Sequence, residues 1–261
     1  MLPSDAPILL YLWDKRTFCI SRFAGPIRLS QAAAMLLVGL DGPLQLQSAG
    51  AAICSHSALL PAGLELEVDS QNSRVAICYL DVFGEDFALL APRMAHIQGG
   101  VLHGLDSETA SIERFDQLHR QCADPEQIQA WMEELINPHQ CAPAGFALDS
   151  RIVRVVELIK ADVACNQSIA YLAEQVGLSV PRLSQLFRQK IGIPIRRYRQ
   201  WHRLFVTTVG VARGMTLTDA AMVAGFTDSA HLTHTFRSIM GLKPSAVLAH
   251  AQAQRIRLFA A

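Results

Sequence analysis

Ile-Ala-Tyr-Leu-Ala-Glu-Gln-Val-Gly-Leu, at residues 169–178, returns 48 residues later as Leu-Thr-Asp-Ala-Ala-Met-Val-Ala-Gly-Phe, at residues 217–226. Three further positions recur after each glycine, now 49 residues apart: Leu183, Phe187 and Gly192 return as Leu232, Phe236 and Gly241. The offset changes just after the glycine, where a turn belongs. Each copy therefore predicts a short helix, a glycine turn and a longer helix, which is the helix-turn-helix pattern. Two such motifs in tandem make double-stranded DNA the expected partner.

The distribution of charge favours the same partner. The chain has a formal net charge of zero, yet residues 1–150 carry 8 Lys and Arg against 18 Asp and Glu, a net charge of −10. Residues 151–261 carry 15 against 5, a net charge of +10. A basic half binds phosphates and releases their counterions, whereas an acidic half is repelled by them. We therefore expect the C-terminal half alone to contact DNA.

The length and composition indicate two domains. A chain of 261 residues, 51% of them hydrophobic, can bury a core in each. The longest apolar run, residues 32–40, is too short to cross a bilayer, so we expect no membrane partner. The first 15 residues lack the basic stretch and apolar core of a signal peptide, which predicts a cytoplasmic protein.

The cysteines give no sign of a metal or a cofactor. All six are scattered and form no Cys-x-x-Cys pair, so we expect free thiols. This spacing also argues against an enzyme with an attached DNA-binding domain, such as a DNA-repair alkyl acceptor. Such a protein needs metal-liganding cysteines or an activated thiol.

Residues 7–80 read as short strands cut by turns every eight to twelve residues. Asp41-Gly42 separates two apolar runs and predicts a hairpin between them. Further turns are expected at residues 48–50, 61–63 and 70–73, and residues 64–68 alternate between apolar and acidic. This pattern predicts an antiparallel β barrel or jelly roll.

A barrel of this size either holds one small ligand or is filled by its own side chains, and the sequence leaves both open. Four residues are candidates to line an effector pocket: Trp13, Phe18, His56 and Tyr79. His56 is the lone histidine among the expected strands, and a metal-binding barrel of the cupin type needs several, together with a carboxylate. We therefore expect no metal there.

Two amphipathic helices are expected after the strands. One covers residues 111–118, and the other starts at Asp124-Pro125, where Asp124 caps the helix and Pro125 takes its first position. The two helices can pack on the barrel, on each other or on a second subunit. We favour partial use of the second helix's apolar stripe in a homodimer interface, through Ile128, Trp131, Met132 and Leu135.

The C-terminal half begins with a packing helix capped by Asp149 or Ser150. In the first motif, Ser168 caps the short helix, Gly177 makes the turn and Ser179 caps the recognition helix. The apolar residues of each recognition helix must face the core, which leaves the polar positions for DNA. These are Arg182, Ser184, Gln185, Arg188 and Gln189 in the first motif and Ser229, Ala230, His231, Thr233, His234 and Arg237 in the second or on its flanks.

A connecting helix over residues 195–213 sets the distance between the motifs. At roughly 18 residues it spans about 27 Å, which can place the two recognition helices about 34 Å apart, one DNA turn. Arg196, Arg197, Arg199 and Arg203 keep this connector basic. The second half of the connector is a poor helix former, so it must be held by packing or it bends.

Residues 150–250 resemble the DNA-binding domain of the AraC/XylS family of bacterial transcription regulators. The resemblance rests on Leu183, Phe187, Gly192, Arg203-Leu204, Asp219-Ala220-Ala221, Gly225-Phe226, Asp228-Ser229-Ala230-His231-Leu232, Phe236-Arg237, Gly241 and Pro244-Ser245. Residues 37–80 are more faintly similar to the cupin-like sensor domain of many members. The family's base-contacting positions fall on Pro181, Ser184 and Gln185 in the first motif, and on Ser229, Ala230, His231 and His234 in the second.

We thus expect a two-domain α+β protein. A cupin-like sensor or dimerisation domain with C-terminal helices covers residues 1–140, a linker covers 141–149, and an all-α DNA-binding domain covers 150–261, with motifs at about 168–191 and 216–240. The leading hypothesis is a sequence-specific transcription regulator, an activator that works with RNA polymerase and responds to a small effector. The alternative is a regulator that needs no ligand and whose barrel only dimerises or contacts protein partners.

Overall fold

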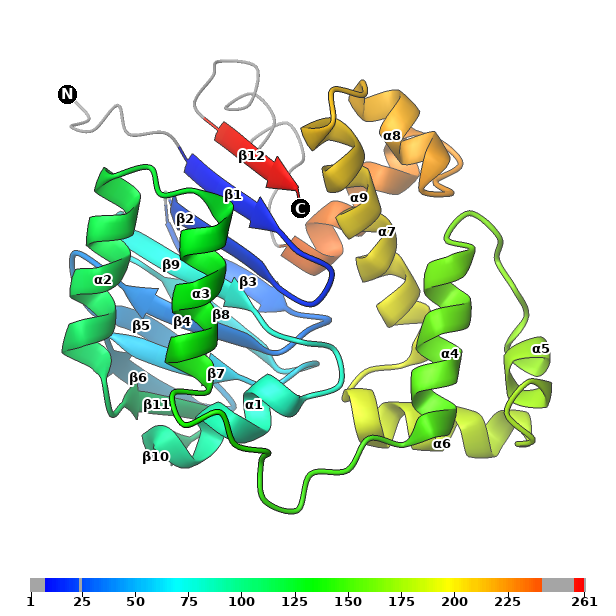
Figure 1. Cartoon of the computed structure of the whole chain (residues 1–261), viewed down its shortest axis with the longest axis horizontal. Coiled ribbons are helices and arrows are strands. Elements are labelled where there is room, and N and C mark those ends of the chain that lie inside the picture. The colour runs from blue at the N-terminus through cyan, green and yellow to red at the C-terminus, as the bar shows by residue number, and fades with distance from the viewer. Residues whose placement is uncertain (1–7, 24, 241–255, 261) are drawn as a thin grey trace.

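The computed structural model describes residues 8–23, 25–240 and 256–260, and it has a β-rich half and a helical half (Figure 1). The β-rich half contains two sheets. The larger sheet runs in the order β10 (Met94–Gln98), β11 (Val101–Leu105), β7 (Ser57–Leu60), β4 (Met35–Gly39), β9 (Arg74–Tyr79), β2 (Thr17–Arg22), β1 (Ile8–Leu12) and β12 (Ile256–Ala260). The smaller sheet runs β3 (Ile27–Ser30), β8 (Glu65–Asp69), β5 (Leu44–Ser48) and β6 (Ala51–Ser55). This is the predicted cupin-like β domain, built as two facing sheets and not as a closed barrel.

The hairpin predicted at Asp41-Gly42 is wrong. β4 pairs with β7 and β9 in the large sheet, whereas β5 pairs with β6 and β8 in the small one. All five residues of β4 are buried, which suits a central strand covered on both faces. The chain instead turns a corner between the sheets, so tightly that a Cβ on Gly39 would lie 2.2 Å from the carbonyl oxygen of Gly42.

The turn predicted at residues 48–50 does close a hairpin, between β5 and β6. Ala49 and Gly50 both have positive φ, at 47° and 79°, as a two-residue hairpin turn requires. In β5, Leu44 and Leu46 point into the core and the two glutamines point outward, so the alternation seen in the sequence is confirmed.

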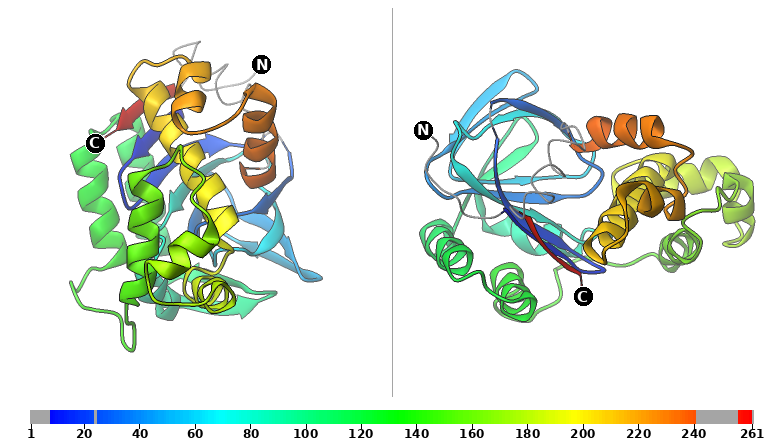
Figure 2. Two further views of the ribbon diagram at one scale, coloured as in Figure 1. Left: turned by 90° about the vertical axis from the view of Figure 1, so that its right-hand side faces the viewer. Right: turned by 90° about the horizontal axis from the view of Figure 1, so that it is seen from above.

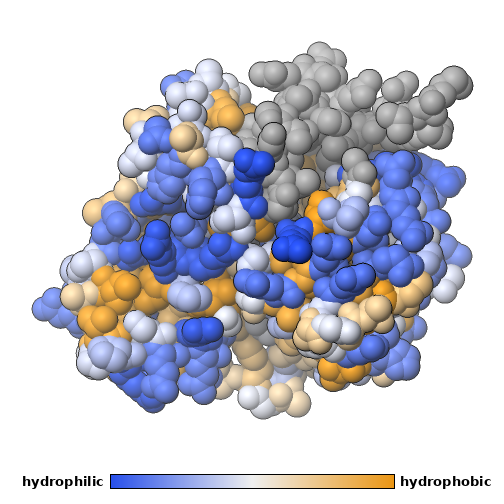
Figure 3. Space-filling view, turned by 180° about the vertical axis from the view of Figure 1, so that it is seen from behind, coloured by the Kyte–Doolittle hydropathy of each residue, from blue (hydrophilic) through white to orange (hydrophobic). Residues whose placement is uncertain are grey.

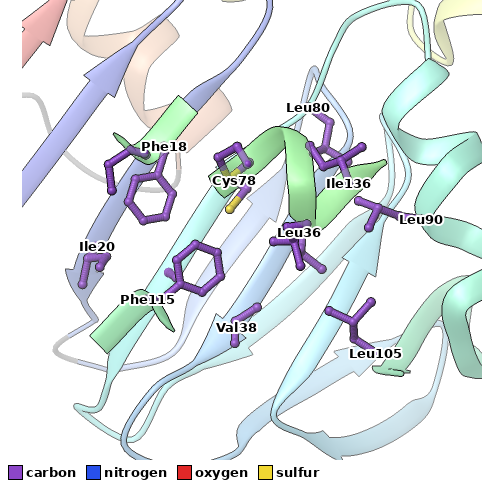
Figure 4. Close-up of a cluster of buried hydrophobic side chains, with 14 of the residues drawn as sticks. Phe18, Ile20, Leu36, Val38, Cys78, Leu80, Leu90, Leu105, Phe115 and Ile136 are labelled. Carbon is purple, nitrogen blue, oxygen red and sulfur yellow. The ribbon is translucent and has the colours of Figure 1, made fainter. Parts of the chain in front are cut away.

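Two hydrophobic cores lie on the two faces of the large sheet. One fills the space between the sheets, with Leu44, Leu46, Val68 and Val101 among its fully buried members. The other lies between the outer face of the large sheet and the helices α1 (Glu85–Leu90), α2 (Glu108–Arg120) and α3 (Pro125–Ile136). Figure 4 shows this second core, where the rings of Phe18 and Phe115 stack with centroids 5.3 Å apart.

The dimer interface predicted on α3 is contradicted by this packing. Ile128, Met132 and Leu135 are between 0% and 3% exposed, because the apolar stripe of α3 lies against the chain's own sheet and α2. Trp131 is half-buried, with its ring edge-on to Phe115. The stripe is therefore satisfied within one subunit and is not available to a second. The helix start was predicted correctly, since Asp124 and Gln127 form a reciprocal capping box.

The helical half contains six described helices, and their starts follow the sequence closely. They are α4 (Ser150–Ala161), α5 (Ile169–Glu174), α6 (Val180–Ile191), α7 (Ile195–Ala212), α8 (Leu217–Val223) and α9 (Ser229–Met240). Asp149, Ser168, Ser179 and Thr216 each cap a helix through a side-chain oxygen. Gly177 and Gly225 take positive φ, 63° and 82°, at the turn of each motif. Figure 1 shows α5 and α6 at one end of α7 and α8 at the other.

The two halves touch at several points, and the C-terminal strand joins them. β12 pairs in parallel with β1 over five residues, so the end of the helical half returns to the edge of the large sheet. Lys160 on α4 forms an ion pair with Asp14 at 2.8 Å. The α6–α7 turn lies on the β7–β8 turn, where a Cβ on Gly192 would be 3.1 Å from the oxygen of Ala62. Figure 2 shows the helical half side by side with the sheets. Residues 241–255, including Gly241 and the Pro244-Ser245 pair of the resemblance, lie outside the described residues.

Candidate nucleic-acid interface

The recognition helix of the first motif is α6, and its fold is fixed by burial of one face. Leu183, Leu186, Phe187 and Ile191 are at most 4% exposed and pack against α4, α5 and α7. The hydroxyl of Ser179 accepts a hydrogen bond from the amide of Arg182, and Pro181 sits in the first turn, where a missing N–H costs little. The residues that we expect to contact DNA are all exposed: Pro181, Arg182, Ser184, Gln185 and Arg188.

Side-chain hydrogen bonds already organise this exposed face. Arg182 donates from Nη1 to Oε1 of Gln185 at 3.0 Å, which leaves the amide nitrogen of Gln185 free to face outward. Ser184 donates to the carbonyl of Val180 at 2.9 Å and is thereby committed to its own helix. Gln185 is therefore the long polar side chain best placed to read a base, with Arg182 holding it in place.

In the second motif, α9 exposes Ser229, Ala230, His234 and Arg237, whereas His231 is half-buried. The ring of His231 lies edge-on to Phe226, with centroids 5.2 Å apart, and Nδ1 is 3.3 Å from the hydroxyl of Thr227. The carboxylate of Asp228 accepts the backbone N–H of His231 at 2.7 Å, and this bond holds the pKa of Asp228 below its usual value. His231 is thus positioned by the fold at the start of α9, and His234 is the freer of the two histidines.

Cations without a carboxylate partner gather on this half. Among the described residues, Arg182, Arg188, Lys190, Arg196 and Arg237 are exposed and form no ion pair within 4.0 Å. Unpaired surface cations are available to DNA phosphates at no cost in broken ion pairs. Figure 3 shows the face behind Figure 1, where hydrophilic side chains cover much of the surface between separate apolar areas.

Three of the four arginines expected to make the connector basic have another role. Arg197 donates to the carbonyls of Ser30 and Ser238, at 2.6 and 2.7 Å, and so joins α7 to β3 and α9. Arg199 donates to the carbonyl of Gln167, and Arg203 to that of Val163. Burial lowers the pKa of all three guanidinium groups. Of the four, Arg196 is the one left exposed.

The four candidate effector residues do not come together. Phe18 and Trp13 are buried in the core under α2 and α3, where Trp13 stacks on Tyr11 at 5.8 Å. Tyr79 packs into the other core, between the sheets. His56 lies at the β6–β7 turn, with Nδ1 3.3 Å from the carbonyl oxygen of Gly39. Because Trp13 and Phe18 lie on one face of the large sheet and Tyr79 on the other, the four remain a prediction without a common site.

The structure places a cleft elsewhere, between α7 and the β-rich half, with a volume of about 180 Å³. Tyr198, Trp201, His202 and Phe205 line one side of it. The opposite side comes from the β1–β2 turn and the segment from the end of β9 into α1. These four residues were not predicted from the sequence, although their spacing of 3, 4 and 7 along a helix marks one aromatic face.

Metal-binding clusters and membrane-spanning helices are both absent from the described residues. In the described part of the chain, no group of three or more His, Cys, Asp or Glu is placed to hold a metal ion. All six cysteines are free thiols. Within the same residues, no helix has the length and apolar character to cross a bilayer.

The sequence matches the Helix-turn-helix domain family over residues 172–250. The Arabinose operon regulatory proteins of Escherichia coli (strain K12) and Salmonella typhimurium (strain LT2) are each 30% identical over 100 residues, which is 38% of this chain and 34% and 36% of theirs. We call the helical half, which carries this likeness, the AraC-type domain. The matched part of the chain spans about a third of the length of these two relatives, so the AraC-type domain is what the likeness covers.

The β-rich half and the AraC-type domain together have a counterpart among solved structures. A variant of apo ToxT from Vibrio cholerae strain SCE256 superposes with a TM-score of 0.64 over 90% of this chain and 97% of that one, at 12% identity. ToxT from Vibrio cholerae O395 gives 0.57 over 89% and 97%, at 13% identity. This likeness shows the two-domain fold, with an AraC-type domain beside a cupin-like β domain.

Proposed function

We propose that the protein is a sequence-specific DNA-binding transcription regulator. The observation that supports this most strongly is the AraC-type domain with two recognition helices, α6 and α9, whose exposed faces carry unpaired cations. Base readout is assigned to Gln185 in the first motif and to His231 and His234 in the second, and phosphate contact to Arg182, Arg188 and Arg237. Pro181, Ser184, Ser229 and Ala230 complete the surfaces that approach the grooves.

The test is selection of DNA by the whole chain. A duplex library with a random centre is incubated with the protein at moderate salt, and bound molecules are recovered and sequenced over several rounds. We expect enrichment of one site with two informative blocks about 10 base pairs apart, because the recognition helices enter successive major grooves. Recovery of duplexes with no shared sequence contradicts sequence-specific regulation.

The proposal includes control by a small effector. One ToxT structure is described as bound to an unsaturated fatty acid, so a protein of this fold takes a small ligand. An activator that binds promoter DNA acts through RNA polymerase, which is the proposed protein partner, and the cytoplasm is the proposed location because its DNA target lies there. A homodimer stays a prediction, whose interface must lie outside the buried stripe of α3.

The second candidate is a regulator that binds no ligand. The space between the two sheets favours it, since that core is filled by the chain's own leucines, valines and isoleucines. Thermal unfolding measured against pools of metabolites separates the two, because a ligand that binds only the folded chain raises its melting temperature.

A further inference from the structure

We infer that the cleft between α7 and the β-rich half is a binding site for a compact neutral aromatic molecule that carries a hydroxyl or carbonyl oxygen. The inference rests on the proposed function, to which it adds the place and the chemical class of the effector. The site differs from the interior of the β domain, where the four candidate effector residues were sought and where side chains fill the space.

The size of the cleft limits the ligand to one or two rings. Its volume is about 180 Å³. A cavity of roughly 150 Å³ holds benzene, and drug-sized ligands occupy pockets of roughly 300–1,000 Å³. A molecule of the size of phenol or a small bicyclic phenol therefore fits, whereas a long acyl chain does not.

The wall formed by α7 is suited to an aromatic ring. Trp201 and Phe205 stack with centroids 6.3 Å apart, and Tyr198 and His202 stack in nearly parallel planes at 6.1 Å. Across the cleft, Phe83 is half-buried and presents a further ring. Ring faces arranged in this way bind a flat apolar body through stacking and dispersion.

Tyr198, which lines the cleft, has a buried hydroxyl without a partner among the described residues. Tyr198 is fully buried, and its phenolic oxygen makes no hydrogen bond. Buried hydroxyls nearly always find a partner, so an orphan marks a place where a ligand or a water completes the bond. An oxygen on the ligand ring would accept the proton of this O–H.

The charges around the cleft favour a neutral ligand. Four carboxylates line it, from Asp14, Asp81, Glu85 and Asp86, and three cations, from Lys15, Arg16 and Lys160. Most of these are already paired: Arg16 forms a bidentate ion pair with Asp86, and Lys160 binds Asp14. The excess of carboxylates opposes an anion. A cation finds few free carboxylates, because Asp86 binds Arg16, Asp14 binds Lys160 and Asp81 accepts the backbone N–H groups of Phe83 and Asp86.

The position of the cleft links ligand binding to DNA binding. α7 joins the two helix-turn-helix motifs, and the opposite wall belongs to the β-rich half. A ligand that touches both walls changes how the β-rich half contacts α7. Because α7 sets the distance between the two recognition helices, this change reaches the DNA-binding surface.

The experiment uses the full chain labelled with 5-fluorotryptophan and observed by fluorine NMR. Its three tryptophans give three signals, and a Trp201→Phe variant assigns the one in the cleft. Titration with phenol is expected to shift the Trp201 signal saturably. The signals of Trp13, buried in the core under α2 and α3, and of Trp131, on α3, are expected to stay in place. Equal shifts of all three signals, or no saturation up to several millimolar phenol, overturn the inference.

Variants and competing probes test the chemistry. Tyr198→Phe is expected to weaken phenol binding about tenfold and to leave binding of benzene, which has no oxygen, unchanged; the exposed Tyr171→Phe serves as the matched control. Benzoate and phenethylamine, which carry opposite charges, are both expected to bind at least several-fold more weakly than phenol, and oleate is expected not to displace it. Unchanged phenol affinity in Tyr198→Phe shows that only water completes the hydroxyl, and displacement by oleate shows the wrong ligand class; either result overturns the assignment.

These titrations contain no DNA, so they fail independently of the proposed function. A chain that binds phenol at Trp201 but selects no DNA site refutes the proposed regulator and leaves the cleft assigned. A chain that selects a site but shows no saturable shift refutes the cleft alone.

Discussion

Gln185 is the residue on which base readout by the first motif depends. Its amide can pair with adenine through both a donor and an acceptor, because Oε1 has a second lone pair besides the one that accepts from Arg182. Gln185→Ala is expected to cost about 1–3 kcal/mol on the selected site and much less on scrambled duplexes. Binding titrations on both duplexes measure this, and an equal loss on both shows that Gln185 does not read a base.

Arg188 is the matched control on the same exposed face of α6. It lies further along the helix and forms no ion pair among the described residues, so we expect it to contact phosphate. Arg188→Ala should weaken binding to the selected and the scrambled duplex alike and lower the salt slope by about one unit. A loss confined to the selected duplex contradicts the phosphate assignment.

His202 makes stability depend on pH in a defined window. Burial, aided by Lys160, lowers its pKa from 6.5 to about 4 in the folded chain. The unfolded chain therefore binds the proton more readily, so the free energy of unfolding falls as the pH drops from about 6.5 to 4. The contribution is at most about 3 kcal/mol. His202→Phe, which keeps a ring between Tyr198 and Phe205, should remove this part of the pH dependence.

The comparison for that prediction is a set of urea unfolding curves between pH 4 and 7. As the pH falls from 7 to 4, the free energy of unfolding of the native chain should fall by more than that of His202→Phe. His234→Phe, at an exposed histidine, should follow the native chain throughout. Identical pH profiles for the native chain and His202→Phe would mean that His202 titrates as it does in water.

At the scale of single elements, β12 is expected to hold the two halves together. It pairs in parallel with β1 over five residues, although it follows the whole AraC-type domain in the sequence (Figure 1). Removal of residues 256–261 should expose the edge of β1 and speed hydrogen exchange of its backbone amides. The amides of α6, which has no contact with β12, should keep their protection. Unchanged exchange in β1 contradicts the pairing.

Elements set by local signals were predicted well, and those set by distant partners were not. The caps at Ser168 and Ser179 and the positive-φ turn at Gly177 act within a few residues, so the sequence predicts the tandem motif directly. The hairpin prediction at Asp41-Gly42 was wrong because the pairing of a strand depends on all the strands of its sheet, and a local turn signal does not determine it. The apolar stripe of α3 predicts that this face of the helix is covered, but it does not tell whether the chain's own sheet or a second subunit covers it.

The same distinction applies to the candidate site. The exposed residues of α6 could be predicted, because the apolar positions of the helix define its buried face and the remaining positions must face outward. The cleft, in contrast, needs a wall from the β1–β2 turn and another from α7, which are about 180 residues apart in the sequence. The spacing of the aromatic residues on α7 was visible, but nothing local says that a partly open space faces them.

At the scale of the whole molecule, the acidic β-rich half lies directly beside the basic AraC-type domain and shares contacts with it. Arg197 joins α7 to β3 and α9, and Lys160 reaches Asp14. These contacts and β12 tie the domain predicted over residues 150–261 to the rest of the chain. DNA binding should therefore be measured on the full chain.

The most direct test of the central claim is hydroxyl-radical footprinting of the full chain on its selected duplex, repeated between 50 and 200 mM salt. The account predicts two protected patches on one face, about 10 base pairs apart, and an affinity that falls steeply with salt. His234→Ala should lose protection at the second patch and keep it at the first. A single patch, or an affinity that does not change with salt, contradicts DNA recognition by both helix-turn-helix motifs.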